Sequence, residues 1–273
     1  MERVNLVVAV LQVDREPWRS IARDGQSKTW MNDIPSNVEI VELYGSTPTW
    51  IAKFADNVHE YLRWKKIPGI FIVKADRILG EVLKSCAKVK SEVTLHSERR
   101  KIIRASIVDV FFTLPFKERE LFRYFLEKTE ASFLYMTNTS SFVNLPELRR
   151  LTESLDPVMV YGGTKNDFGS GTVFASGSNR LLSRDVVERI LARFSDWDFA
   201  WLDDLAMGKL LSREETNWVE IPSVTIDSER GLVQLTTQDI TSIVHFRLKA
   251  VESGSRNDVH LMRQLAEKVR YGP

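Results

Sequence analysis

The 273-residue sequence has little of several features that would assign it to a protein class at once. It contains one cysteine, Cys86, which cannot form an internal disulfide, so a reducing cytosol is expected. Its longest apolar run near the N-terminus, Leu6 to Leu11, is too short to cross a bilayer and is followed by Asp14 and Arg15. We therefore expect a cytoplasmic protein with no signal peptide and no transmembrane segment, and leave open a peripheral attachment to a membrane.

Charge and short motifs exclude further classes. The sequence has 38 Lys and Arg against 37 Asp and Glu, scattered along the chain, for a net charge of +1. This balance gives no electrostatic basis for binding nucleic acid. No G-x-G-x-x-G follows the first apolar run, and neither G-x-x-x-x-G-K-[ST] nor G-x-S-x-G occurs. The sequence therefore lacks the phosphate-binding loops of dinucleotide-binding and P-loop proteins, and it lacks the nucleophile motif of serine hydrolases.

What the sequence does contain is an alternation of short apolar runs with amphipathic stretches. This pattern predicts an α/β fold, with a mixed, mostly parallel sheet covered by helices on both faces. The predicted strands are 5–13, 38–44, 69–73, 107–112 and 133–136, and the predicted helices include 50–66 and 117–128. No internal repeat, low-complexity segment or long linker interrupts the chain. We expect a single domain, with a nucleotide-binding half over residues 1–145 and an acceptor half over residues 146–273.

Polar residues directly after a predicted strand are the first candidates for a site, because α/β sheets bind ligands at the carboxyl ends of their strands. The stretch TNTSS, residues 137–141, follows the strand FLYM. Asn138, Thr139 and Ser140 could hydrogen-bond a ribose or a diphosphate, but amide and hydroxyl groups form a poor shell for a hard dication. Alternatively, the stretch is a polar turn that leads into the following helix.

Two later blocks carry further candidates. In SGSN, residues 176–179, Gly177 is the position where the backbone could approach a ligand closely, with Ser178 beside it, and the neighbouring Arg180 could meet a phosphate. In WLDDLAMG, residues 201–208, Asp203 and Asp204 are adjacent, so on a helix their side chains diverge by about 100° and would have separate roles. Alternatively, these acids only favour the start of a helix through its dipole.

Taken in order, four blocks within residues 132–213 resemble the sugar-nucleotide half of the Fringe and β-1,3-galactosyltransferase family. They read SFLYMTNTSSFVNLPELRRL, VYGG, VFASGSNRLLSRDVVERI and WLDDLAMGKLL. The resemblance implies a GT-A (Rossmann-like) fold and places Asp204 where that family has its general base. Asn138-Thr139-Ser140 stands where the family carries the acidic, metal-binding DxD triplet, so this motif is degenerate here.

The resemblance implies a hexosyltransferase, of the kind used in polysaccharide biosynthesis, that transfers a sugar with inversion. The expected donor is a nucleotide sugar, with UDP as its nucleotide, and the acceptor is a hydroxyl of a glycan, a lipid-linked molecule or another compound. Gly177, Ser178 and Asp203 would contact the donor. The alternative is a catalytically degenerate member of the fold that binds a glycan or nucleotide as an interaction module.

Metal use follows from the altered triplet. The resemblance implies either no required cofactor or a divalent cation, Mn or Mg. In the first case a basic residue, Lys28, Arg180 or Lys165, would help to hold the diphosphate. His245, in the apolar stretch IVHFRLKA, lies where related enzymes often place a histidine on the metal or the diphosphate. A lone histidine in such a strand is otherwise a hydrogen-bonded core residue.

Overall fold

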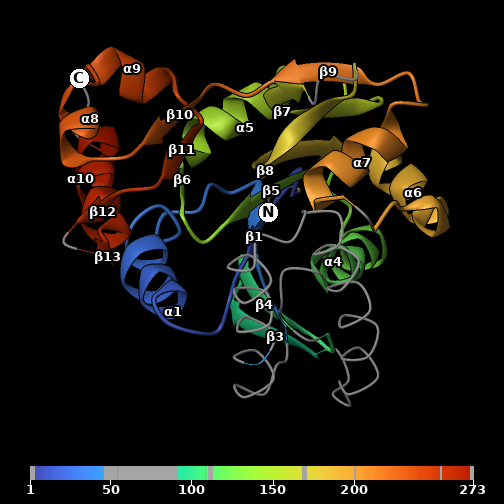
Figure 1. Ribbon diagram of the computed structural model, residues 1–273, viewed down its shortest axis with the longest axis horizontal. Coiled ribbons are helices and arrows are strands. Elements are labelled where there is room, and N and C mark those ends of the chain that lie inside the picture. Colours follow the sequence, from blue (N-terminus) through green and yellow to red (C-terminus); the bar gives the residue numbers. More distant parts are fainter. Residues whose placement is uncertain are drawn as a thin grey trace, which may run out of the picture.

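A central sheet of eight strands organises the protein (Figure 1). The computed structural model describes residues 4–45, 54, 92–107, 109, 113–167, 171–199, 201–252 and 254–270. The strands run in the order β3-β4-β2-β1-β5-β8-β7-β9. Their bounds are β1 Leu6–Leu11, β2 Val38–Gly45, β3 Glu92–Ser97, β4 Arg100–Ala105, β5 Phe133–Asn138, β7 Val160–Asp167, β8 Val173–Ser183 and β9 Asn217–Glu220.

The centre of this sheet is parallel. Strands β4, β2, β1 and β5 are joined by parallel pairings, as are β7 and β9, whereas β3 and β8 run antiparallel to their neighbours. The mixed α/β fold with a mostly parallel sheet is therefore confirmed. Near-continuous apolar sequence is typical of strands buried on both faces, and all six residues of β1 are buried.

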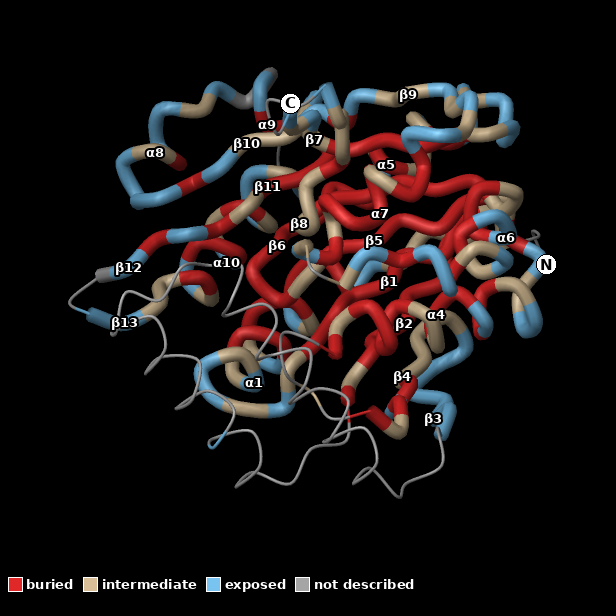
Figure 2. Tube along the Cα trace, turned by 45° about the vertical axis from the view of Figure 1, so that its right-hand side comes forward, coloured by how far each residue is buried: buried red, intermediate tan, exposed pale blue. Residues whose placement is uncertain are grey.

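Helices cover both faces of the sheet, because successive strand residues point to opposite sides. Val7, Ala9 and Leu11 of β1 pack on one side with α4 (Leu114–Lys128), α6 (Arg184–Ala192) and α7 (Asp203–Leu211). Leu6, Val8 and Val10 pack on the other side with α5 (Leu145–Glu153) and α10 (Asp258–Arg270). Figure 2 shows the result, a buried sheet centre between more exposed layers.

A second, three-stranded sheet lies beside the central one in the order β10-β11-β6. Its strands are β6 Ser141–Val143, β10 Ser223–Ile226 and β11 His245–Leu248, and β6 follows β5 after only two residues. The remaining elements are α1 (Trp18–Ser20) with the helical turns Ile21–Gly25 and Gln26–Lys28 after it, the turn Phe194–Asp196, the helices α8 (Glu229–Val233) and α9 (Thr237–Ser242), and the hairpin β12 (Val251–Glu252) and β13 (Ser255–Arg256).

The strand predicted at 107–112 falls mostly outside the described residues, and only Ile107 and Asp109 of it are described. Ile107 and Asp109 lie outside any strand, and the strand that pairs with β2 is β4, which begins with Arg100 and Lys101. Two charged residues hide this strand in the sequence, but each pairs with a buried carboxylate of β2. Arg100 Nε lies 2.6 Å from Glu42 Oε1, and Lys101 Nζ lies 2.6 Å from a carboxylate oxygen of the same strand.

Some expectations concern residues outside the described part of the chain. These are the strand at 69–73, the helix at 50–66 apart from residue 54, and Cys86. No helix within the described residues combines the length and apolar character needed to cross a membrane.

Candidate functional site

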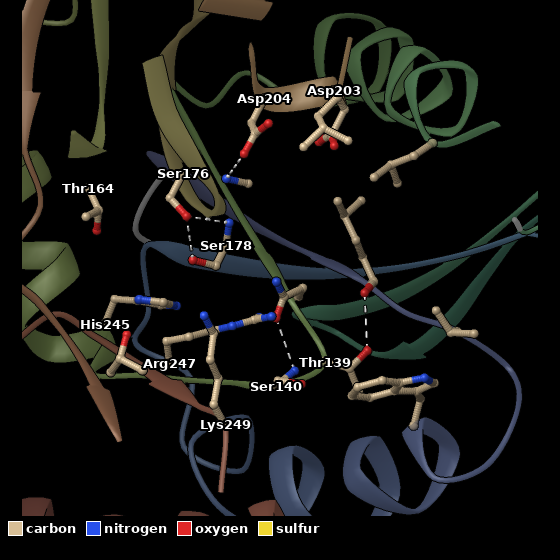
Figure 3. Close-up of a pocket in the computed structure, with 18 of the residues that line it drawn as sticks. Thr139, Ser140, Thr164, Ser176, Ser178, Asp203, Asp204, His245, Arg247 and Lys249 are labelled. Atoms are coloured by element: carbon tan, nitrogen blue, oxygen red, sulfur yellow. Dashed lines mark hydrogen bonds between the residues drawn. The ribbon is translucent and has the colours of Figure 1, made fainter. Parts of the chain in front are cut away.

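A pocket of about 760 Å³ opens at the carboxyl ends of β1 and β5, where the central sheet meets the smaller one. This volume is in the range of sites for small molecules. The pocket is lined by the ends of these two strands, the middle of β8, the start of α7, the strand β10 and one side of β11 (Figure 3). It brings together most of the residues that the sequence singled out: Asn138, Thr139, Ser140, Gly177, Ser178, Asp203, Asp204 and His245.

The turn after β5 is held by side-chain hydrogen bonds, both within the turn and to neighbouring elements. Asn138 Oδ1 accepts hydrogen bonds from the Ser140 amide, at 3.1 Å, and from Ser141 Oγ, at 3.1 Å, and also from the guanidinium of Arg247. Thr139 Oγ1 donates to the buried Gln12 Oε1 at 2.9 Å. The stretch is thus neither a simple helix cap nor a loose loop, because it joins β5 to β6 in a fixed shape at the pocket wall.

Asp204 is the carboxylate that the fold presents to this pocket most directly. It lies in the first turn of α7, and its Oδ2 accepts the Gly177 amide at 3.0 Å while its Oδ1 accepts the Leu205 amide at 2.8 Å. Each oxygen keeps capacity for a further hydrogen bond. Gly177 also makes room for this carboxylate, since a Cβ added there would lie 3.3 Å from Asp204 Oδ2. The space left by the missing side chain of Gly177 is therefore next to Asp204. From the sequence, we expected a ligand in this space.

Arg180 differs from its predicted role as a phosphate ligand. Its side chain is fully buried and forms an ion pair with Glu118 of α4, and its Nη2 lies 3.1 Å from Asp203 Oδ2. Burial raises the pKa of both carboxyls, against the attraction of Arg180. Both carboxyls face the same buried guanidinium. The cluster anchors the start of α7 beneath Asp204.

The two lysines named with Arg180 lie outside the pocket lining. Lys28 has an exposed side chain, and its Nζ pairs with Asp24 Oδ1 at 2.8 Å one helical turn away. Lys165, on β7, is likewise outside the lining.

His245 lines the pocket from β11 but is 1% exposed. Its Nε2 lies 2.9 Å from Ser141 Oγ, and burial lowers the pKa of the imidazole to about 3, so the ring is neutral at neutral pH. Among the residues that the structure describes, no group of three or more His, Cys, Asp and Glu side chains comes together as a cation site.

Sequence reasoning missed the basic and aromatic residues of this pocket. Arg247 and Lys249 come from β11 and the residue after it, and Trp18 comes from α1. The signal for two of them was present, because IVHFRLKA alternates polar and apolar residues as a strand with one polar side does. Trp18 follows a polar stretch and had no comparable signal. The pocket wall also includes Thr164, Ser176 and Ser223, whose hydroxyls suit a sugar.

Comparison with known proteins gives only distant likenesses. No protein-family model matches this sequence, and no curated protein matches it. Solved structures that resemble the fold include a glycosyltransferase involved in the glycosylation of the major capsid of PBCV-1, with 7% identity, coverage of 95% of this chain and 99% of that chain, and a TM-score of 0.49.

Another is the apo form of the glycosyltransferase GlyE of Streptococcus pneumoniae, with 10% identity, coverage of 96% of this chain and a TM-score of 0.46. A second GlyE structure has 10% identity, coverage of 97% of this chain and a TM-score of 0.43. In both cases the alignment covers 60% of the GlyE chain. Likenesses of this degree do not by themselves assign a family or an activity to this protein.

Proposed function

We propose that this protein transfers a sugar from a nucleotide-sugar donor to a hydroxyl group, with Asp204 as the general base. One observation carries the proposal. Three of the four sequence blocks that resemble one glycosyltransferase family contribute residues to the same pocket, at 138–140, 176–178 and 203–204. Residues far apart in the chain thus converge where an α/β sheet binds ligands.

The chemistry needs one carboxylate next to the acceptor. The acceptor oxygen attacks the anomeric carbon, the bond from that carbon to the donor's phosphate oxygen breaks, and its electron pair leaves with the nucleoside diphosphate. Asp204 takes the proton of the attacking hydroxyl. Attack on the side opposite the leaving group inverts the anomeric centre. The two backbone amides that hold the Asp204 carboxylate fix its orientation for this step.

Polar, uncharged groups around Asp204 suit the sugars. Ser176 and Ser178 come from β8, with their Oγ atoms 3.0 Å apart, and Thr164 Oγ1 lies 2.5 Å from Ser223 Oγ across the two sheets. Such hydroxyls both donate to and accept from sugar hydroxyls. We propose a UDP-linked hexose as the donor, and as the acceptor a glycan, a lipid-linked molecule or another hydroxyl compound.

The test is turnover in a charge-removing variant. UDP-hexoses are incubated with wild-type protein and release of UDP is measured, since slow hydrolysis needs no known acceptor. Asp204→Asn should lower the rate by about 10² to 10⁴-fold, the usual contribution of a general base, and should leave donor affinity within a few-fold. Asp196→Asn is the matched control, because that carboxylate is half-exposed and pairs with Arg193 at the surface.

Two results would count against the proposal. Unchanged UDP release by Asp204→Asn would remove Asp204 from the mechanism. Failure of the wild-type protein to bind any nucleotide or nucleotide sugar would remove the transferase function and favour a glycan-binding module.

A further inference from the structure

One side of β11 gives the pocket a positively charged wall. His245, Arg247 and Lys249 are spaced two residues apart and all line the pocket. The alternate residues Phe246, Leu248 and Ala250 are buried in the apolar core. This alternation is the period of a β-strand, so the strand necessarily turns its polar side chains to one face. Figure 3 shows Arg247 and Lys249 on the side of the pocket away from Asp203 and Asp204.

The two cations of this wall lack carboxylate partners. Arg247 donates to the neutral Asn138 side chain, and within the described chain neither it nor Lys249 forms an ion pair. By contrast, Lys117 on the pocket wall is paired with Asp109 at 2.9 Å. Arg256 adds a third positive group close by, since its Nη2 donates to Ser140 Oγ at 2.9 Å while also pairing with Asp258.

This arrangement costs free energy until an anion binds. Burial and the nearby Arg256 lower the pKa of Arg247, and the attraction of Asp258 offsets this only in part. A charged group that is largely removed from water normally has an opposite charge beside it. A phosphate oxygen between Arg247 and Lys249 would supply that charge through charge-assisted hydrogen bonds.

The same residues do not suit the divalent cation that the resembled family uses. The position of its acidic triplet offers the Asn138 amide oxygen and two hydroxyls, and this amide oxygen already accepts from Arg247, Ser140 and Ser141. Magnesium and manganese prefer carboxylate oxygens. A guanidinium at hydrogen-bond distance from the only amide ligand would also repel a dication.

We propose that Arg247 and Lys249 form an anion site that binds the donor's diphosphate directly, without a divalent metal ion. The site itself stands on the geometry of β11, and its assignment to the diphosphate of a nucleotide sugar rests on the proposed function. Arg247 would be held in place by Asn138, which gives the altered triplet a positioning role. His245 stays neutral and holds Ser141, the first residue of β6.

The experiment titrates the protein with inorganic pyrophosphate and, separately, with UDP, each in EDTA, by calorimetry. The variants are Lys249→Gln, Arg247→Gln and the two together. Each should weaken pyrophosphate binding by about 10-fold or more, the effect expected for one charge-assisted contact. Lys249→Arg keeps the positive charge and should bind pyrophosphate with nearly the wild-type affinity. The control is Arg263→Gln with Lys268→Gln, which removes the same charge from exposed positions on α10 and should change binding less than 2-fold.

Lys249 is exposed and follows the strand, so Lys249→Gln is expected to fold even if Arg247→Gln does not. The anion site is overturned if pyrophosphate binds only with added Mn²⁺ or Mg²⁺, or if Lys249→Gln binds it as tightly as the control does.

The failure of this proposal and that of the proposed function are distinguishable. UDP-sugar turnover that is indifferent to Lys249→Gln and Arg247→Gln would overturn the anion site and keep the transferase. Pyrophosphate binding that depends on Lys249, in a protein that binds no nucleotide sugar, would support the anion site and overturn the transferase.

Discussion

Replacing Arg180 with methionine should destabilise the protein far more than an ordinary loss of an ion pair. Arg180 is fully buried between Glu118 and Asp203, so Arg180→Met leaves two buried carboxyls without a cation. Removing one partner of such a pair costs about 3–5 kcal/mol, because the remaining charge has no compensation. For a chain of this length that corresponds to a fall in Tm of about 5–9 °C.

The assay is urea unfolding at pH 7, followed by circular dichroism and tryptophan fluorescence. Arg189→Met on α6 is the matched control, since Arg189 is 53% exposed at its side chain and pairs with Glu214 at the surface. Its loss should cost less than about 1 kcal/mol. Adding Glu118→Gln to Arg180→Met should recover part of the stability, because it removes one of the two uncompensated carboxyls.

The pH dependence gives a second check on the same cluster. Burial raises the pKa of Glu118 and of Asp203. Their protonated forms thus stabilise the fold below the ordinary carboxyl pKa, and that stability is lost as pH rises through the raised value. The deficit of Arg180→Met should therefore grow from pH 5 to pH 8. Equal effects of Arg180→Met and Arg189→Met, at every pH, would refute the account of the buried cluster.

Two further predictions concern the pocket. Gly177→Ala should lower turnover about 10-fold while stability changes by less than about 1 kcal/mol, because the new Cβ would lie 3.3 Å from Asp204 Oδ2 and shift that carboxylate; undiminished turnover would contradict the positional role of Gly177. His245→Gln should make the free energy of unfolding less sensitive to acid. The pKa of His245 is lowered to about 3 from 6.5, so its contribution is complete above pH 6.5 and is lost as pH falls towards 3. Urea unfolding at pH 7 and at pH 4.5 gives the free energy of unfolding at each pH. Between these two pH values the wild type should lose roughly 2.5 kcal/mol more of it than the variant does, and equal losses would argue against the buried neutral ring.

The central strands could be predicted because a short run of apolar residues is stable only when it is buried, as in the middle of a sheet that helices cover on both faces. Residues 5–13, 38–44 and 133–136 correspond to β1, β2 and β5, and the helix expected at 117–128 is most of α4. Prediction failed at β4, where Arg100 and Lys101 look like surface residues. Their carboxylate partners lie on β2, far away in the sequence, so no local pattern could show that these charges would be compensated.

The candidate site divides in a similar way. Asn138 and Asp204 could be proposed from local context, because one ends a strand and the other lies in the first turn of a helix, and such positions meet at one edge of the sheet. Ser178 lies inside β8 and was proposed only as the neighbour of Gly177. Arg180 and Lys28 were misplaced for one shared reason. A basic residue near a glycine or an aromatic looks the same whether it faces a ligand, a buried acid or water, and only packing distinguishes these cases.

The sequence by itself determined the periodic features of this protein. Runs of apolar residues, alternation and helix starts are local consequences of side-chain spacing, and they specified an α/β fold with polar blocks after its strands. Tertiary structure alone decided how charges are paired. It buried Arg180 with Glu118 and Asp203. It also placed Arg247 of the second sheet, and Lys249 directly after that strand, across the pocket from Asp204. Electrostatic partners are set by distance in space, which a linear chain does not record until it folds.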